Sequence, residues 1–167
     1  TLPANIAIEV HCAPNCGTVV ADATQIHQVI LNLGSNAAHA MRDHGGVLRI
    51  ALDPTEVSPD LALSLGTSAA NSYVRLSVSD TGHGMDEATR ARIFEPFFTT
   101  REVGKGSGMG LASGYGIVKQ HEGWIEVFSD PGQGASFFTY LPVCGKEPAD
   151  IARRIENELE YPGQIKV

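Results

Sequence analysis

The sequence predicts an α/β (α+β) two-layer sandwich, in which a mixed sheet carries helices on one face. Three observations indicate this class. Apolar residues recur at helical spacing from Ile26 to Met41, residues 73–79 alternate as in a half-buried strand, and residues 124–141 have the pattern of a strand hairpin around a Gly-rich turn. Strands and long helices mixed along one chain bury their apolar sides by packing as two layers.

The first half of the chain opens with strand signals and continues with a long helix. Short apolar runs at residues 6–10 and 18–20 lie on either side of Pro14-Asn15, which predicts two strands joined by a turn. Asp22 is a good N-cap for the helix that follows, and Gly45-Gly46 ends it. A third strand is expected at residues 47–52.

The second half alternates between loops and regular elements. Residues 53–72 are rich in Pro, Ser, Ala and Asn, which predicts a surface excursion before the strand at 73–79. Helices are expected near residues 86–93 and at 111–121. The hairpin is expected to pair strands 124–129 and 135–141.

Composition indicates a single domain with an appendage. The chain has 167 residues, 43% of them hydrophobic, which suits one domain at residues 1–146. Residues 147–167 are more charged and are interpreted as a C-terminal linker or appendage, with a short amphipathic helix suggested by Ile151, Ile155 and Leu159.

Net charge, apolar runs and cysteine usage indicate which partners and which cellular compartment the sequence suits. The net charge of -7 argues against nucleic acid as a partner. No apolar run is long enough to span a membrane, so we expect a soluble, cytoplasmic fragment, either alone or as the cytoplasmic part of a membrane sensor. The three cysteines indicate reduced thiols. His11, Cys12 and Cys16 lack a second pair of zinc ligands, so a turn is favoured there.

The first candidate site lies on the opening helix. Asn32 and Asn36 are four residues apart, so their amides share one helix face, and His39 lies near it. A carboxamide oxygen is a suitable ligand for magnesium, and its amino group can donate to phosphate. The alternative is an ordinary polar helix stripe.

The second candidate is Asp80, at the end of a strand and directly before Gly82, Gly84 and Met85. A carboxylate there can accept a hydrogen bond from an exocyclic amine such as that of adenine, whereas guanine presents a carbonyl at that edge. An Asp-Thr-Gly turn without a ligand is the alternative.

Two glycine clusters flank an aromatic segment, which suggests a jointed loop closing over a nucleotide. The second cluster runs into the predicted helix at 111–121, so its backbone amides can form a nest for phosphate, with a lysine as a point charge. A flexible loop is the alternative. Phe97 and Phe98 in between are either anchors of a lid or a minor core under a long loop. The phosphate-binding candidates are Lys105, Gly106, Ser107, Gly108, Met109, Gly110 and Leu111.

Together these motifs resemble the catalytic ATP-binding domain of sensor histidine kinases, in the wider family of gyrase, Hsp90-type chaperones and MutL. The resemblance covers residues 1–143. Five segments are similar to the family's boxes, in the family's order: the asparagine box at 28–41, the first glycine box at 80–85, the phenylalanine box at 94–98, and two further glycine boxes at 104–111 and 132–137.

The resemblance implies a Bergerat-type ATP-binding fold with ATP and Mg²⁺ as ligands. By position in the boxes, Asn32 and Asn36 hold magnesium and phosphates, while Asp80 binds the adenine amine. The base is lined by Gly82, Gly84 and Met85. The third glycine box departs from the family at Ala135, where a threonine is usual.

Asn32 separates two activities within this family. ATP-hydrolysing relatives carry a glutamate at this position, which activates water, and an amide cannot act as that base. The expectation is therefore phosphoryl transfer by a protein histidine kinase of a two-component system. An ATP-hydrolysing conformational machine and a degenerate interaction module remain as alternatives.

The resemblance also implies partners outside the chain. None of the six histidines has the context of a phosphoacceptor, so no catalytic residue is assigned here. We expect the acceptor histidine on a dimerisation and histidine-phosphotransfer domain upstream in the same protein. A response regulator receiver domain is expected as the next partner. The full protein is expected to be dimeric, either with or without a membrane anchor. Gln164-Ile165-Lys166-Val167 is compatible with the start of a receiver domain.

Overall fold

The computed structural model describes residues 2–66 and 72–144. The expected domain boundary at residues 146–147, the amphipathic segment and the strand at the C-terminal end lie outside this range. Among the described residues, no helix combines the length and the apolar character needed to cross a bilayer.

Five strands and four helices follow one another along the described chain. They are β1 (Ile6–Cys12), α1 (Ala23–Ala40), β2 (Gly46–Glu56), α2 (Pro59–Ser64), β3 (Ser72–Asp80), α3 (Glu87–Arg90), α4 (Gly110–Gln120), β4 (Trp124–Ser129) and β5 (Ala135–Pro142).

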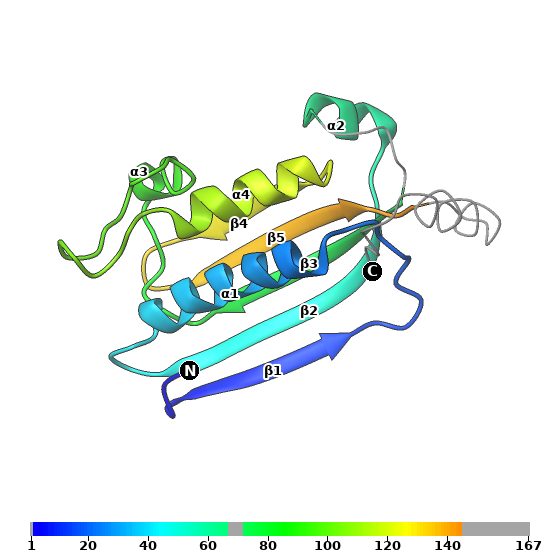
Figure 1. Cartoon of the computed structure of the whole chain (residues 1–167). Coiled ribbons are helices and arrows are strands. Elements are labelled where there is room, and N and C mark those ends of the chain that lie inside the picture. Colours follow the sequence, from blue (N-terminus) through cyan, green and yellow to red (C-terminus); the bar gives the residue numbers. More distant parts are fainter. Residues whose placement is uncertain (1, 67–71, 145–167) are drawn as a thin grey trace.

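The strands form one mixed sheet in the order β1-β2-β3-β5-β4. β1 pairs in parallel with β2, and every other pair is antiparallel. Figure 1 shows α1 and α4 side by side over one face of this sheet. The predicted two-layer α+β sandwich, with a mixed sheet and helices on one face, is thereby confirmed.

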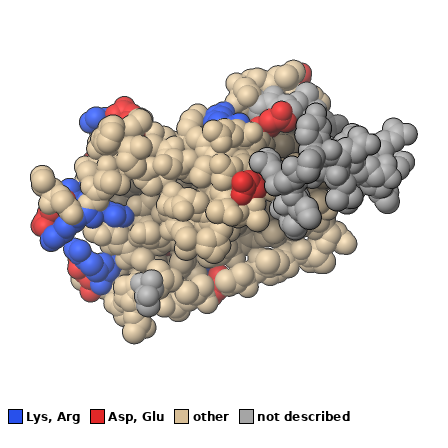
Figure 2. Space-filling model, in the orientation of Figure 1, with Lys and Arg blue, Asp and Glu red and all other residues tan. Residues whose placement is uncertain are grey.

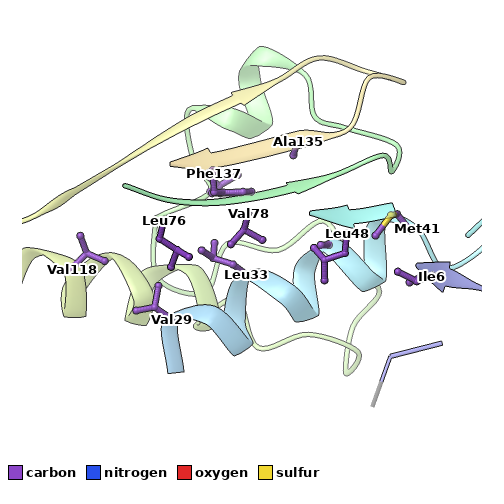
Figure 3. Close-up of a cluster of buried hydrophobic side chains, with 12 residues drawn as sticks. Ile6, Val29, Leu33, Met41, Leu48, Leu76, Val78, Val118, Ala135 and Phe137 are labelled. Atoms are coloured by element: carbon purple, nitrogen blue, oxygen red, sulfur yellow. The ribbon is translucent and has the colours of Figure 1, made fainter. Parts of the chain in front are cut away.

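The core lies between the two long helices and the sheet. Val29, Leu33 and Ala37 recur on one face of α1 and are buried, because this face meets the strands. Figure 3 shows Val29 and Leu33 pointing toward Leu76 and Val78 of β3, together with side chains from β2 and β5. This packing fixes α1 over the centre of the sheet.

The sequence placed the start of α1 correctly. Asp22 has an extended backbone, and its Oδ1 accepts hydrogen bonds from the backbone N–H groups of Thr24 and Gln25, at 2.9 and 3.2 Å. The helix ends at Ala40, several residues before the predicted stop at Gly45-Gly46, and Gly46 opens the next strand.

Two expectations in the first half were wrong. Residues 18–20 form no strand. The carbonyl of Thr18 instead accepts one hydrogen bond from the N–H of Cys144 at 2.8 Å, which ties this segment to the chain after β5 without a ladder. The surface excursion is also shorter than predicted, because β2 continues to Glu56 and α2 begins at Pro59 behind the N-cap Ser58.

Candidate functional site

A pocket of about 320 Å³ opens between α1, the end of β3, the start of β5 and the segment that leads into α4. Eleven of the predicted site residues line it: Asn32, Asn36, His39, Asp80, Gly84, Met85, Gly106, Ser107, Gly108, Gly110 and Leu111. Three others do not line it: Gly82, Lys105 and Met109. Residues that are up to 105 positions apart in the sequence (Asn32 and Phe137) thus share one cavity.

The two asparagines lie on successive turns of α1. Asn32 Nδ2 donates to the carbonyl of Gly110 at 2.9 Å, which ties α1 to the first residue of α4. The Oδ1 atom of Asn32 accepts a hydrogen bond from Gln28 Nε2 at 2.8 Å. Asn36 Nδ2 donates to the backbone carbonyl of Asn32 at 3.0 Å. The Oδ1 atom of Asn36 accepts from Arg101 Nη2 at 2.8 Å. Both amide oxygens are therefore held by donors of the chain itself.

Asp80 provides the carboxylate of the pocket. It is the last residue of β3, and its Oδ1 accepts the N–H of Gly82 at 2.8 Å. Burial raises the pKa of Asp80 above its ordinary value of 3.8, while hydrogen bonds from the backbone of Gly82 and Ala135 and the nearby His83 act in the opposite direction. A partly desolvated acceptor of this kind favours a ligand that brings a hydrogen-bond donor.

The first glycine segment is shaped by close backbone contacts. Gly84 has φ of 69°, and a Cβ there would lie 2.0 Å from the carbonyl oxygen of Asp130 in the β4–β5 turn. A Cβ at Gly82 would lie 2.6 Å from the carbonyl oxygen of Ala40 at the end of α1. The glycines therefore let the segment pass between α1 and this turn, and Gly82 serves packing more directly than it lines the pocket.

The second glycine segment is attached to the aromatic segment before it. Gly108 has φ of 68°, its carbonyl accepts the N–H of Phe97 at 3.0 Å, and a Cβ there would lie 2.4 Å from the carbonyl carbon of Phe97. Lys105 forms an exposed ion pair with Glu102 and points its charge there. The predicted lysine point charge is thus engaged outside the pocket in this conformation.

The two adjacent phenylalanines have different surroundings. Phe98 lines the pocket and packs against the main core, and the Arg92 guanidinium lies 4.5 Å from its ring centre. Phe97 has φ of 66° and is 75% exposed. Phe98 thus packs against the main core and not into a separate minor one, and the role of either side chain as an anchor of a closed lid stays a prediction.

Sequence reasoning missed several residues of the pocket. His39, by contrast, was among the predicted residues. Its pKa is lowered below 6.5, first by burial and then by nearby positive charges, while Asp43 has a smaller opposite effect; the charges are those of Arg101, Arg42 and His83. The most informative omission is Arg101, a cation three residues before the second glycine segment. The lining residues absent from the predicted site are Ser35, Ala40, His83, Thr89, Ile93, Phe98, Thr99, Thr100, Arg101, Ala135 and Phe137.

The donor set fits a nucleotide bound with a divalent cation. Asn32 and Asn36 each offer a neutral amide oxygen on the same side of α1, and phosphate oxygens and water can complete an octahedral shell around magnesium. The N-terminal end of α4 begins at Gly110 beside these amides, so its backbone N–H groups favour an anion. The residues present are thus compatible with Mg²⁺ and phosphates.

Comparison with known proteins identifies the family. Residues 21–144 match the model of the histidine kinase-, DNA gyrase B- and HSP90-like ATPases. The chain is 38% identical over 156 residues to "Sensor kinase CckA" of Brucella abortus (strain 2308). This aligned region covers 89% of this chain and 16% of that protein.

Two solved structures have the same fold. The mycobacterial sensor histidine kinase MprB is similar with a TM-score of 0.63 and 27% identity, over 83% of this chain and 82% of that one. Full-length ShkA in complex with AMPPNP is similar with a TM-score of 0.61 and 30% identity, over 82% of this chain and 25% of that one. The chain thus spans only a small part of such full-length proteins, and it belongs to the family of histidine kinase-, DNA gyrase B- and HSP90-like ATPases, as a domain of the sensor histidine kinase type.

Proposed function

We propose that this chain binds Mg-ATP in the pocket between α1 and α4 and donates the γ-phosphoryl group to a histidine on a separate dimerisation domain of a longer sensor kinase. One observation carries the proposal. A partly buried carboxylate, two amide oxygens and the start of a helix lie around a single cavity, and each suits a different part of one nucleotide.

Asp80 is the proposed recognition group for the base. Its carboxylate would accept a hydrogen bond from the exocyclic amine of adenine, and the raised pKa of this partly buried group reflects the cost of keeping it charged without such a partner. A hydrogen bond to a charged group contributes about 1.5–3 kcal/mol, or about 10–150-fold in affinity. Gly84 and Met85 form the adjoining wall, and Met85 is held there by a hydrogen bond from its N–H to Ser129 Oγ at 2.9 Å.

Asn32, Asn36 and the N-terminal end of α4 are the proposed phosphate and metal groups. Bound magnesium would neutralise charge on the phosphates during transfer. The two amides would orient the metal, and the N–H groups at Gly110 and Leu111 would donate to phosphate oxygens. Positioning of this kind is what phosphoryl transfer requires from the protein.

The absence of a base at residue 32 favours transfer over hydrolysis. Asn32 Nδ2 already donates to the Gly110 carbonyl, and an amide cannot take a proton from water at neutral pH. The phosphoryl group would therefore pass to a supplied nucleophile, in keeping with sensor kinase relatives. A response regulator receiver domain would then accept it from that histidine.

The assignment of Asp80 is tested by titrating ATP against the wild-type chain and Asp80→Asn. The substitution keeps the shape but presents no carboxylate, so we expect ATP affinity to fall by about 10–150-fold. Asp53→Asn is the matched control, because this substitution removes the same charge from β2, where Asp53 pairs with Arg75. Equal ATP affinities for wild type and Asp80→Asn would contradict the assignment.

A further inference from the structure

Arg101 lies between α1 and the second glycine segment. Its Nη2 atom donates to Asn36 Oδ1 at 2.8 Å, and its own backbone N–H donates to Thr99 Oγ1 at 3.1 Å. A Cβ added to Gly106 would lie 2.6 Å from Arg101 Cδ, so this glycine leaves room for the arginine stem. Arg101 therefore connects the glycine segment to the helix that carries both amides.

The partner of Arg101 distinguishes it from the cations around it. Most of the Lys and Arg side chains visible in Figure 2 gather at the end of the molecule that carries α3, next to acidic side chains. Arg92 pairs with Glu95 at 3.0 Å, and Lys105 pairs with Glu102. Arg101 instead donates to a neutral amide oxygen inside the pocket. Its charge is thus available to a ligand of that pocket.

Arg101 and a divalent cation make conflicting demands on Asn36 Oδ1. A magnesium ion binds oxygen at about 2.1 Å, so a guanidinium nitrogen that kept its 2.8 Å hydrogen bond to the same atom would lie within about 5 Å of the metal. Two cations at that separation repel each other strongly in a partly buried site. Phosphate oxygens in the same cavity offer the guanidinium a better, charged partner.

We propose that the Arg101 guanidinium and Mg²⁺ are alternative partners of Asn36 Oδ1, so that binding of the metal beside the nucleotide displaces Arg101 from α1. This inference rests on the proposed function of the pocket. Because Gly106 packs on the arginine stem, the exchange also links occupation of the metal site to the position of the second glycine segment. Without metal, the Arg101 guanidinium is the cation that binds the phosphates of the nucleotide.

The test is a double titration of the 167-residue chain with ATP, once with excess Mg²⁺ and once with EDTA. The measured quantity is the ratio of the dissociation constant in EDTA to that in Mg²⁺. Arg101→Met keeps an unbranched stem against Gly106 and removes the charge. We expect it to raise this ratio by about tenfold or more, because metal-free binding loses its cation and the metal no longer displaces one.

Two further variants make the result specific. Arg49→Met removes the same charge from β2, where Arg49 forms an exposed ion pair with Glu9 of β1, and it should leave the ratio at the wild-type value. Arg101→Lys keeps a positive charge and should stay closer to wild type than Arg101→Met. An unchanged or lower ratio for Arg101→Met, or an equal rise for the Lys and Met variants, would overturn the inference. Failure of the wild-type chain to bind ATP under both conditions would instead overturn the proposed function, and the inference with it.

Discussion

At the scale of single residues, Asp80 combines a structural cost with a functional use. Burial raises the pKa of its carboxyl above 3.8, so the folded chain holds this proton more tightly than the unfolded chain does. A group with a raised folded-state pKa stabilises the fold below its unfolded pKa, and this contribution is lost as the pH rises through the folded value. The wild-type carboxylate therefore lowers the free energy of unfolding at neutral pH.

Replacing Asp80 by Asn should remove this pH dependence. We expect the free energy of unfolding of Asp80→Asn, relative to wild type, to increase as the pH rises from about 4 to about 8, because only the wild type carries the buried charge at the upper end. Urea unfolding of both chains across this range measures the difference. A difference that stays constant or shrinks with rising pH would contradict the burial argument. The same variant, weak in ATP binding yet stable, would separate the two roles of the residue.

Gly84 and Gly132 allow backbone strain to be separated from backbone contact. Both have positive φ, of 69° and 77°, so alanine costs at least about 1 kcal/mol at either position. At Gly84 the new Cβ would also lie 2.0 Å from the Asp130 carbonyl oxygen, whereas at Gly132 no atom lies within 4 Å.

Gly84→Ala should accordingly lower the free energy of unfolding by at least about twice as much as Gly132→Ala. The Gly132 variant is the matched control, because it introduces the same methyl group into the turn that Gly84 contacts. Denaturant unfolding of the two variants and wild type measures both losses. Equal losses would mean that the contact with the β4–β5 turn does not hold the first glycine segment in place.

At the scale of elements, the segment before α4 is held by few described contacts between its ends. Gly108 accepts from Phe97, Arg101 reaches α1, and Asn32 holds the Gly110 carbonyl. The proposed phosphate site is formed by backbone N–H groups in this segment. Nucleotide binding should therefore order a stretch that is now joined to the rest of the pocket mainly at its two ends.

We expect amide hydrogen exchange of residues 104–110 to slow when Mg-ATP is added. The physical reason is that N–H groups that donate to phosphate oxygens no longer open to water independently. Mass-spectrometric exchange on the 167-residue chain measures the effect, and residues 135–142 of the paired strand β5 serve as the internal reference. Unchanged exchange at 104–110 under saturating nucleotide would count against closure of this segment over the phosphates.

Local patterns predicted most of the elements, and they failed where contacts between distant segments decide the structure. The cap at Asp22 and the spacing of Val29, Leu33 and Ala37 specify α1 within the chain itself. The run at residues 18–20 has the composition of a strand, but within the described part of the chain its backbone bonds to Cys144, after β5, instead of to a neighbouring strand. α2 was missed although Ser58 and Pro59 form a typical helix start, because the surrounding composition favoured a loop.

The candidate site divides in the same way. Asn32, Asn36 and Asp80 stand out by type and spacing, and they line one pocket, while their roles stay predictions. Arg101 could not be found by spacing, because its contact with Asn36 spans 65 positions. Lys105 was chosen for its charge, yet Glu102, three residues earlier, pairs with it. Local sequence cannot decide between such competing partners.

At the scale of the whole molecule, strand order accounts for the site. Placing β3 in the middle of the sheet brings Asp80, at its end, beside the first residue of β5 and under the helix layer. α1 and α4 then cover neighbouring strands and meet at Asn32 and Gly110. The fold thus gathers the proposed base-binding and phosphate-binding groups on one side of the sheet.

This arrangement predicts that the chain binds ATP but does not phosphorylate itself. His39 and His83 line the pocket, but none of the six histidines of the chain has the sequence context of a phosphoacceptor. Incubated with γ-labelled ATP, the 167-residue chain should acquire no acid-labile label. Adding the dimerisation domain of the same full-length protein in trans should restore labelling on that domain, and its acceptor His→Ala variant should abolish it. Efficient release of phosphate by the chain alone, without any acceptor, would favour an ATP-hydrolysing machine, because it would require a base that Asn32 cannot provide.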